Sequence, residues 1–163
     1  MTDIEDSKDS PLTPEIAVSH WLNTETPPLT LAGLRGEVVM LHAFQMLCAG
    51  CTLQATPQAV RMWHQFREAG LKVIGLHTVF EHHAVMTPAA LAVYVHEFRI
   101  PFPVGVDQAV AGHAIPRTMA TYRLQGTPST LLIDRAGRLR HHHFGMETDE
   151  ALARKISVLL AEK

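Results

Sequence analysis

The sequence predicts an α/β fold in which helices cover both faces of one central sheet. Two apolar runs, 37–44 and 71–77, are each followed by a segment whose apolar residues have helical spacing. This alternation of strand and helix is typical of a parallel pair. Farther along, the runs 129–134 and 138–144 flank Arg135-Ala136-Gly137, which indicates an antiparallel hairpin. We therefore expect a parallel pair first and an antiparallel pair that closes the sheet.

The first strand, 37–44, leads into a predicted helix over about 51–69. Gly70 should end this helix, because glycine is favoured just beyond a helix terminus. Pro57 should kink it, since proline cannot donate a hydrogen bond to the carbonyl of Leu53. The residues expected on its buried face are Leu53, Val60, Trp63 and Phe66.

The second strand, 71–77, is followed by a helix that opens at Thr87-Pro88, a typical cap and first turn. Its expected buried residues are Leu91, Val95 and Phe98. A short strand in "FPVGVD" and a short helix opened by Pro116 precede the hairpin. The last helix begins near Thr148, with acidic residues in its first turn. We expect it to bury Leu152, Ile156, Leu159 and Leu160.

Length and composition indicate one domain. The chain has 163 residues, 47% of them hydrophobic, enough for one core over 15–163. Residues 1–14 are polar and contain two prolines, which predicts a disordered lead-in. The net charge of −2 argues against nucleic acid or an anionic membrane as a partner. No basic start with an apolar run precedes the domain, so with Met1 as the start we expect a cytoplasmic protein.

Both cysteines of the chain lie in "AFQMLCAGCTLQATP", residues 43–57. Cys48 and Cys51 fall at the junction of the first strand and the first long helix, where unpaired N–H groups favour a thiolate. With two residues between them, the sulfurs can close into a disulfide with little backbone movement. A reversible dithiol is the favoured interpretation, in which Cys48 attacks and Cys51 resolves. Two buried structural cysteines, or half of a zinc site completed by histidines, remain alternatives.

A proline also precedes an apolar strand in "QGTPSTLLID". Pro128 cannot donate to a β-ladder, so it belongs at a strand start or edge. From about Trp21 to Leu160 the chain resembles the TlpA-like and redoxin branch of the thioredoxin superfamily. The segments that carry the resemblance are "PPLTLAGLRGEVVMLHAFQMLCAGC", "LKVIGLHTVFEHH" and "GTPSTLLIDRAGRLRHHHFG".

The resemblance implies a three-layer sandwich around a mixed sheet, with the dithiol facing a cis Pro128. Thr127 would then offer its backbone to an extended substrate segment. The redox-active disulfide itself would serve in place of a cofactor.

Three positions depart from the family pattern. Leu47 stands where tryptophan commonly precedes the first cysteine, and Gln54 stands where many TlpA-like relatives carry glutamate. Pro57 comes one residue later than usual. The proton acceptor for Cys51 is therefore open, and our candidates are His77 and Glu81 in "GLHTVFEHH". A half-buried structural histidine and a solvated loop are the competing interpretations.

The run His141–His143 alternates across a strand, so His141 and His143 share one face. We expect an exposed strand there, with metal binding by the pair as the alternative.

The function indicated is thiol–disulfide exchange, running as a reductase on a disulfide-bearing protein or a small thiol, with an unidentified electron donor. A thiol peroxidase is the second hypothesis, although Gln45 stands where peroxiredoxins carry threonine. A metal-binding module and a redox-inactive interaction domain are the others.

Overall fold

The centre of the sheet is a parallel pair made by the two strands that the apolar runs predict. The computed structural model describes residues 9–26 and 28–163. Its central strands are β2 (Val38–Phe44) and β3 (Leu71–His77), which pair in parallel along their full length. Every residue of β2 is buried, as expected for a strand covered on both faces.

Four further strands complete a mixed sheet in the order β1-β4-β3-β2-β5-β6. They are β1 (Val18–Leu22), β4 (Val104–Asp107), β5 (Ser129–Ile133) and β6 (Leu139–Phe144). β4 runs parallel to β3, whereas β1, β5 and β6 run antiparallel to their neighbours. The predicted parallel pair and hairpin are confirmed. β1 was not predicted, because it is an edge strand without a buried residue that pairs with a strand far along the chain.

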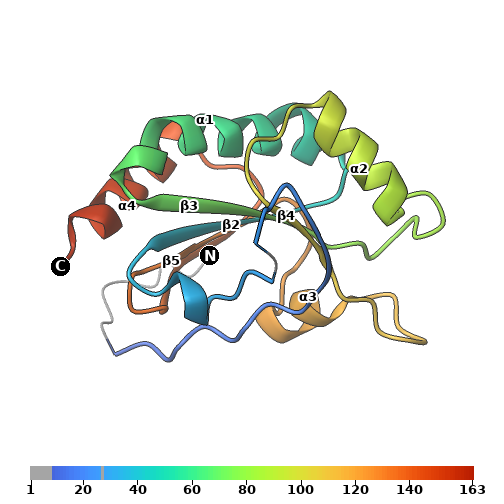
Figure 1. Cartoon of the computed structure of the whole chain (residues 1–163), viewed down its shortest axis with the longest axis horizontal. Helices are drawn as coiled ribbons and strands as arrows, with labels where there is room; N and C mark the ends of the chain where they lie inside the picture. Colours follow the sequence, from blue (N-terminus) through green and yellow to red (C-terminus); the bar gives the residue numbers. More distant parts are fainter. Residues whose placement is uncertain (1–8, 27) are drawn as a thin grey trace.

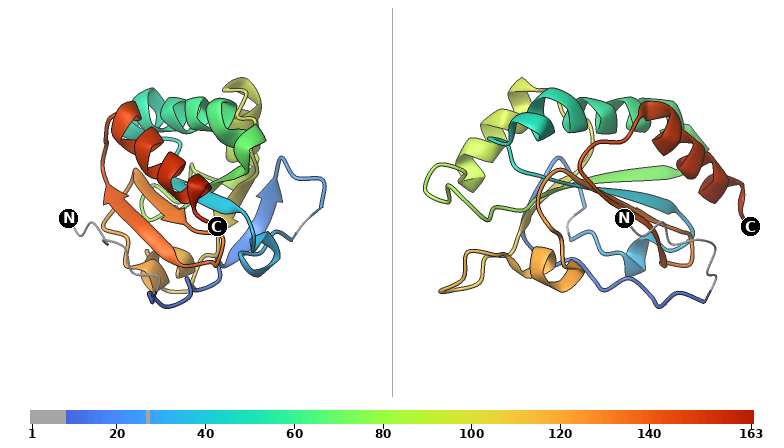
Figure 2. Two further views of the ribbon diagram at one scale, coloured as in Figure 1. Left: turned by 90° about the vertical axis from the view of Figure 1, so that its left-hand side faces the viewer. Right: turned by 180° about the vertical axis from the view of Figure 1, so that it is seen from behind.

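Helices cover both faces of the sheet, as predicted (Figure 1). The helical segments are η1 (Ala32–Leu34), η2 (Cys51–Ala55), α1 (Thr56–Phe66), η3 (Arg67–Ala69), α2 (Pro88–Glu97), α3 (Arg117–Tyr122) and α4 (Asp149–Ala161). α1, α2 and α4 lie on one face and α3 on the other (Figure 1). Figure 2 shows α1 and α4 side by side, where Arg61 and Asp149 form an ion pair with Nε and Oδ2 2.6 Å apart.

The first helix is irregular at Pro57, as expected. Its opening turn, η2, is a π-helix in which Thr56 donates to the carbonyl of Cys51. Pro57 lies in the first turn of α1, directly after the point where the π-helix ends.

The predicted buried face of this helix is wrong at Leu53, whose side chain is 75% exposed. The small residues Ala55 and Ala59 face the sheet instead and allow close packing, together with Met62. The larger predicted residues, Val60, Trp63 and Phe66, lie partly buried at the border of that contact. In α2, Leu91 and Val95 are buried as predicted, but Phe98, which directly follows the helix, is exposed, with its ring centroid 4.5 Å from that of Tyr94.

Residues 1–8 of the predicted disordered lead-in, 1–14, lie outside the described residues. Disorder is the wrong prediction for residues 12 and 13. Leu12 forms a β-bridge with Arg138, and the N–H of Thr13 donates to the carbonyl of Gly137 at 2.8 Å. This segment therefore continues the sheet beyond the hairpin.

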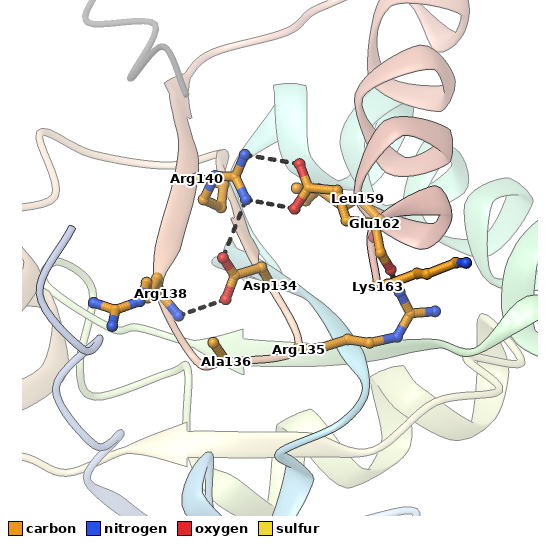
Figure 3. A pocket seen from close by; sticks show the side chains of 8 residues that line it. All are labelled: Asp134, Arg135, Ala136, Arg138, Arg140, Leu159, Glu162 and Lys163. Carbon is orange, nitrogen blue, oxygen red and sulfur yellow. Dashed lines mark hydrogen bonds and ion pairs between the residues drawn. The ribbon is translucent and has the colours of Figure 1, made fainter. Parts of the chain in front are cut away.

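A buried arginine fastens the end of α4 to the hairpin (Figure 3). Arg140 on β6 donates to Asp134 at 3.1 Å and, through both terminal nitrogens, to Glu162 at 2.7 and 2.9 Å. Arg135 donates to the last carbonyls of the helix, including that of Leu160 at 3.0 Å. These contacts satisfy the helix C-terminus, and the shallow cavity beside them is structural.

The sheet separates two hydrophobic cores, one under α1, α2 and α4 and one on the side of α3. Among the described residues, no helix combines the length and the apolar character that crossing a bilayer requires.

Candidate functional site

The two cysteines lie where β2 ends and η2 begins, and they form a disulfide with their Cα atoms 5.2 Å apart. Cys48 is half-buried, whereas Cys51 is fully buried. The N–H of Cys51 points at the Sγ of Cys48 from 3.3 Å. A backbone N–H at a helix start stabilises negative charge, so this contact favours a thiolate on Cys48 in the reduced protein.

The loop before β5 faces the dithiol. The peptide bond between Thr127 and Pro128 is cis. The carbonyl oxygen of Thr127 lies 3.6 Å from the Sγ of Cys48. Gly50 lies beside the proline ring: a Cβ added there would be in ordinary van der Waals contact with the Cδ of Pro128, 3.8 Å away. The structure thus brings Cys48, Cys51, Thr127 and Pro128 together at one edge of the sheet.

Gln45 connects the loops around the dithiol, and its side chain is almost fully buried. Its Oε1 accepts a hydrogen bond from the N–H of Phe80 at 3.2 Å. Its Nε2 donates to the Oε1 of Glu81 at 3.3 Å and lies 3.5 Å from the Oγ1 of Thr127. From the sequence, Gln45 is notable only because it stands where peroxiredoxins carry threonine. Its bridging role depends on partners 35 and 82 positions away, which no local pattern indicates.

Glu81 is exposed, and Gln45 links it to the Thr127 loop. His77 is buried, and its Nε2 accepts a hydrogen bond from the N–H of Met46 at 3.1 Å. Burial lowers the pKa of His77 to about 4. The proton-relay roles of His77 and Glu81 stay predictions. For His77, accepting a proton from Cys51 at Nε2 first requires that the bond to Met46 breaks.

A second buried histidine, His42, lies in the middle of β2 and is not among the site residues predicted from the sequence. Its Nε2 is 2.9 Å from the Oγ1 of Thr56, and its ring stacks on Phe44. Its Nδ1 has no hydrogen-bond partner among the described residues. Burial lowers its pKa to about 4, so the ring is neutral near pH 7. The sequence signal that could have indicated this buried histidine is its position as a single polar residue within an apolar run.

Apolar side chains flank the dithiol on the outer surface. Leu47, directly before the first cysteine, is 62% exposed. Phe144 at the end of β6 is exposed and packs its ring against the Cα of Gly126, beside the proline loop. Leu47 thus presents an exposed apolar group directly before the first cysteine.

The predicted exposure of the histidine run is wrong for His141. This residue is buried, and its Nε2 lies 2.7 Å from the Oε2 of Glu147. Burial occurs because β6 leads directly into the turn before α4, which folds back over this face of the strand. Among the described residues, His141, His143 and Glu147 form the one group with metal-ligating side chains close enough to share an ion.

The AhpC/TSA family model matches residues 13–142. The chain belongs to the AhpC/TSA family. A thioredoxin-like superfamily protein of known crystal structure is 51% identical in sequence to this chain. The two structures superpose with a TM-score of 0.90 over 93% of this chain and 97% of that one. A thiol-disulfide isomerase from Corynebacterium glutamicum is 46% identical, with a TM-score of 0.90 over 96% of this chain and all of that one. The thioredoxin-like fold is therefore confirmed.

Curated relatives match over shorter shares of their own length. Protein DipZ of Mycobacterium bovis is 33% identical over 129 residues, which are 78% of this chain and 17% of DipZ. The thiol-disulfide oxidoreductase ResA of Bacillus thuringiensis is 25% identical over 78% of this chain and 66% of ResA. This chain thus spans about a sixth of the DipZ proteins that it matches.

Proposed function

We propose that this AhpC/TSA family protein is a thiol–disulfide oxidoreductase whose redox centre is the Cys48–Cys51 dithiol. The observation that carries the proposal is the disulfide at the start of η2 facing the Thr127–Pro128 loop. The names of the thiol-disulfide isomerase and of ResA support the same chemistry.

The exchange starts with the reduced protein. The Cys48 thiolate attacks one sulfur of a substrate disulfide; a Cys48–substrate bond forms, the substrate bond breaks, and the first substrate thiol leaves with a proton from solvent. The Cys51 thiol then loses its proton, and its sulfur attacks Cys48 Sγ. The Cys48–Cys51 bond forms and the second substrate thiol is released. Two electrons have passed to the substrate, and a dithiol donor must restore the reduced state.

The difference in exposure assigns these roles. A substrate sulfur can reach half-buried Cys48, whereas fully buried Cys51 can reach only its neighbour. The loop of Thr127 supplies a backbone carbonyl beside the attacking sulfur, where an extended substrate segment can pair. Leu47 and Phe144 offer apolar contacts to the same segment.

We further propose that the protein acts as a reductase in a reducing compartment, in keeping with the cytoplasmic location expected from the sequence. Ala49 and Gly50 carry no charge that would stabilise the thiolate further. The expected reduction potential is therefore nearer the ~−270 mV of thioredoxin than the ~−120 mV of the strong oxidant DsbA. Equilibration with glutathione or dithiothreitol buffers, followed by thiol trapping, measures it.

The decisive test is reduction of insulin with dithiothreitol as donor. Wild-type protein should accelerate precipitation of the insulin chains, and Cys48→Ser should reduce the rate to the background of dithiothreitol alone. Cys51→Ser is the matched control: reduced beforehand and mixed with insulin after the dithiothreitol has been removed, it should trap the Cys48–substrate mixed disulfide, visible by mass spectrometry. Equal turnover by the wild type and Cys48→Ser would refute the proposal.

A thiol peroxidase is not favoured, because the amide of Gln45 is committed to Phe80, Glu81 and Thr127. Peroxide consumption by the reduced protein, measured with the same variants, should remain slow relative to disulfide reduction.

A further inference from the structure

A cluster of ligand-type side chains lies apart from the dithiol, at the outer edge of the sheet. It consists of His141 and His143 on β6 and Glu147 in the turn before α4. One nitrogen or oxygen from each residue lies within 4.8 Å of the others. The side chains of His141 and Glu147 are only 6% and 7% exposed, whereas His143 is half-buried and opens the cluster toward the surface.

The sheet holds both histidines on one face. His143 pairs with Thr130 and His141 with Leu132, two positions apart on the same two strands. Their rings are nearly parallel, with an interplanar angle of 11° and centroids 6.0 Å apart. Both face the side of the sheet that α4 covers.

Three contacts to the backbone fix the turn that carries Glu147, one of them between the Nε2 of His143 and the carbonyl oxygen of Met146, 3.1 Å apart. The N–H of Gly145 donates to the carbonyl of Pro128 at 2.8 Å, and the carbonyl of Glu147 accepts from the Nε2 of Gln58 at 2.8 Å. Gly145 adopts a φ of +91°, a conformation that suits glycine and lets the chain reverse toward the histidines. The backbone is therefore fixed both before and after the Cα of Glu147, and this limits where its side chain can lie.

The carboxylate already has the support expected of a metal ligand. Lys155 on α4 donates to its Oε1 at 2.9 Å, which leaves Oε2 directed at the Nε2 of His141, 2.7 Å away. One carboxylate oxygen of Glu147 is thus oriented by Lys155, a partner outside the cluster.

We propose that His141, His143 and Glu147 form a binding site for one divalent transition metal ion of the zinc type. Imidazole and carboxylate ligands suit Zn²⁺, Co²⁺ and Ni²⁺, and three protein ligands leave one position for water. On binding, the metal takes the place of the direct contact between His141 and Glu147. Tetrahedral ligands about 2.0–2.1 Å from zinc lie roughly 3.3 Å apart. Half-buried His143 is the ligand that swings inward to close the site.

This site contains neither cysteine and does not rest on the proposed function, although its turn is hydrogen-bonded to Pro128 of the loop that faces the dithiol. The competing interpretation is a purely structural His–Glu–Lys network that supports the start of α4. Such a network would require no metal, and His143 would contribute to it only through its Nε2, which lies 3.1 Å from the carbonyl oxygen of Met146.

The test uses the full chain with Cys48 and Cys51 oxidised, confirmed by the absence of free thiols, so that neither sulfur can bind metal. Titration with Co²⁺ near pH 7.5 should produce one equivalent of tetrahedral d–d absorption, which Zn²⁺ then displaces. His143→Ala should weaken Co²⁺ binding by at least about tenfold. His142→Ala, on the opposite face of the strand, should bind Co²⁺ like the wild type. Zn²⁺ should also raise the melting temperature of the wild type and not that of His143→Ala.

Two results would overturn the proposal: no stoichiometric Co²⁺ binding by the oxidised wild type, or equal binding by the wild type and His143→Ala. If His143→Ala fails to fold in the metal-free state, judged by circular dichroism, Glu147→Gln takes its place. This variant retains the size of the side chain and one oxygen but lacks the charge. If it bound Co²⁺ with the same affinity as the wild type, the proposal would also be overturned.

Discussion

At the scale of single residues, Gln45 decides how the loops meet at the dithiol. Its buried amide joins the β3–α2 loop, through Phe80 and Glu81, to Thr127 before the proline. Thr127 in turn places its carbonyl beside Cys48. A substrate segment that pairs with this loop therefore depends on a side chain that it does not touch, and Gln45 is a positioning residue.

Gln45→Ala is expected to lower kcat/KM for insulin reduction about tenfold, because the Thr127 loop loses the side chain that holds it beside Cys48. A displacement of about 1 Å in a well-oriented site can cost about a hundredfold in rate, so a tenfold loss corresponds to a smaller shift. The change should fall mainly on KM, since the cysteines themselves stay in place. Gln45→Glu is the matched variant: it retains an acceptor for the N–H of Phe80 but meets Glu81 with like charge. A kcat/KM for Gln45→Ala within twofold of the wild type, in steady-state assays over a range of insulin concentrations, would show that the bridge does not position the loop.

At the scale of elements, the sequence predicts what local signals determine. The strands β2 and β3 are continuous apolar runs, Thr87 caps α2 as expected, and α4 begins next to Thr148 with acidic residues in its first turn, also as expected. The cysteine pair and Pro128 are likewise readable, because each follows from its position next to one strand. β1, Gln45 and His42 were missed because their roles depend on partners distant in the chain. The buried face of α1 was mispredicted because close packing on the sheet selects small alanines over large apolar residues.

The start of α4 provides the second prediction. The Oγ1 of Thr148 accepts a hydrogen bond from the N–H of Ala151 at 3.2 Å, and Asp149 follows in the first turn. Thr148→Ala should therefore lower the free energy of unfolding by about 1 kcal/mol in urea denaturation. Thr148→Ser retains the hydroxyl and should lose much less. Equal stability of the Ala and Ser variants would mean that the hydroxyl does not cap the helix in solution.

At the scale of the whole molecule, two neutral histidines are enclosed between the sheet and its helices. His42 lies within β2 and His77 at the end of β3, and the pKa of each falls from 6.5 to about 4 because of burial. As the pH drops below 6.5, the unfolded chain binds protons at these positions while the folded protein does not. Their contribution to stability is therefore complete above pH 6.5 and is lost progressively as the pH falls toward 4.

We expect the oxidised, metal-free protein to lose about 2 kcal/mol of unfolding free energy for each of these histidines between about pH 7.5 and about pH 5. His42→Gln keeps a polar atom near the Oγ1 of Thr56 but cannot titrate, so it should lose about 2 kcal/mol less than the wild type over this interval. His20→Gln, at an exposed position on β1, is the control and should follow the wild type. Urea denaturation at the two pH values, with a chelator present, measures the difference. A His42→Gln protein whose stability falls as steeply as that of the wild type would show that His42 is protonated in the folded state, because only then would folded and unfolded chains bind equal numbers of protons at this site.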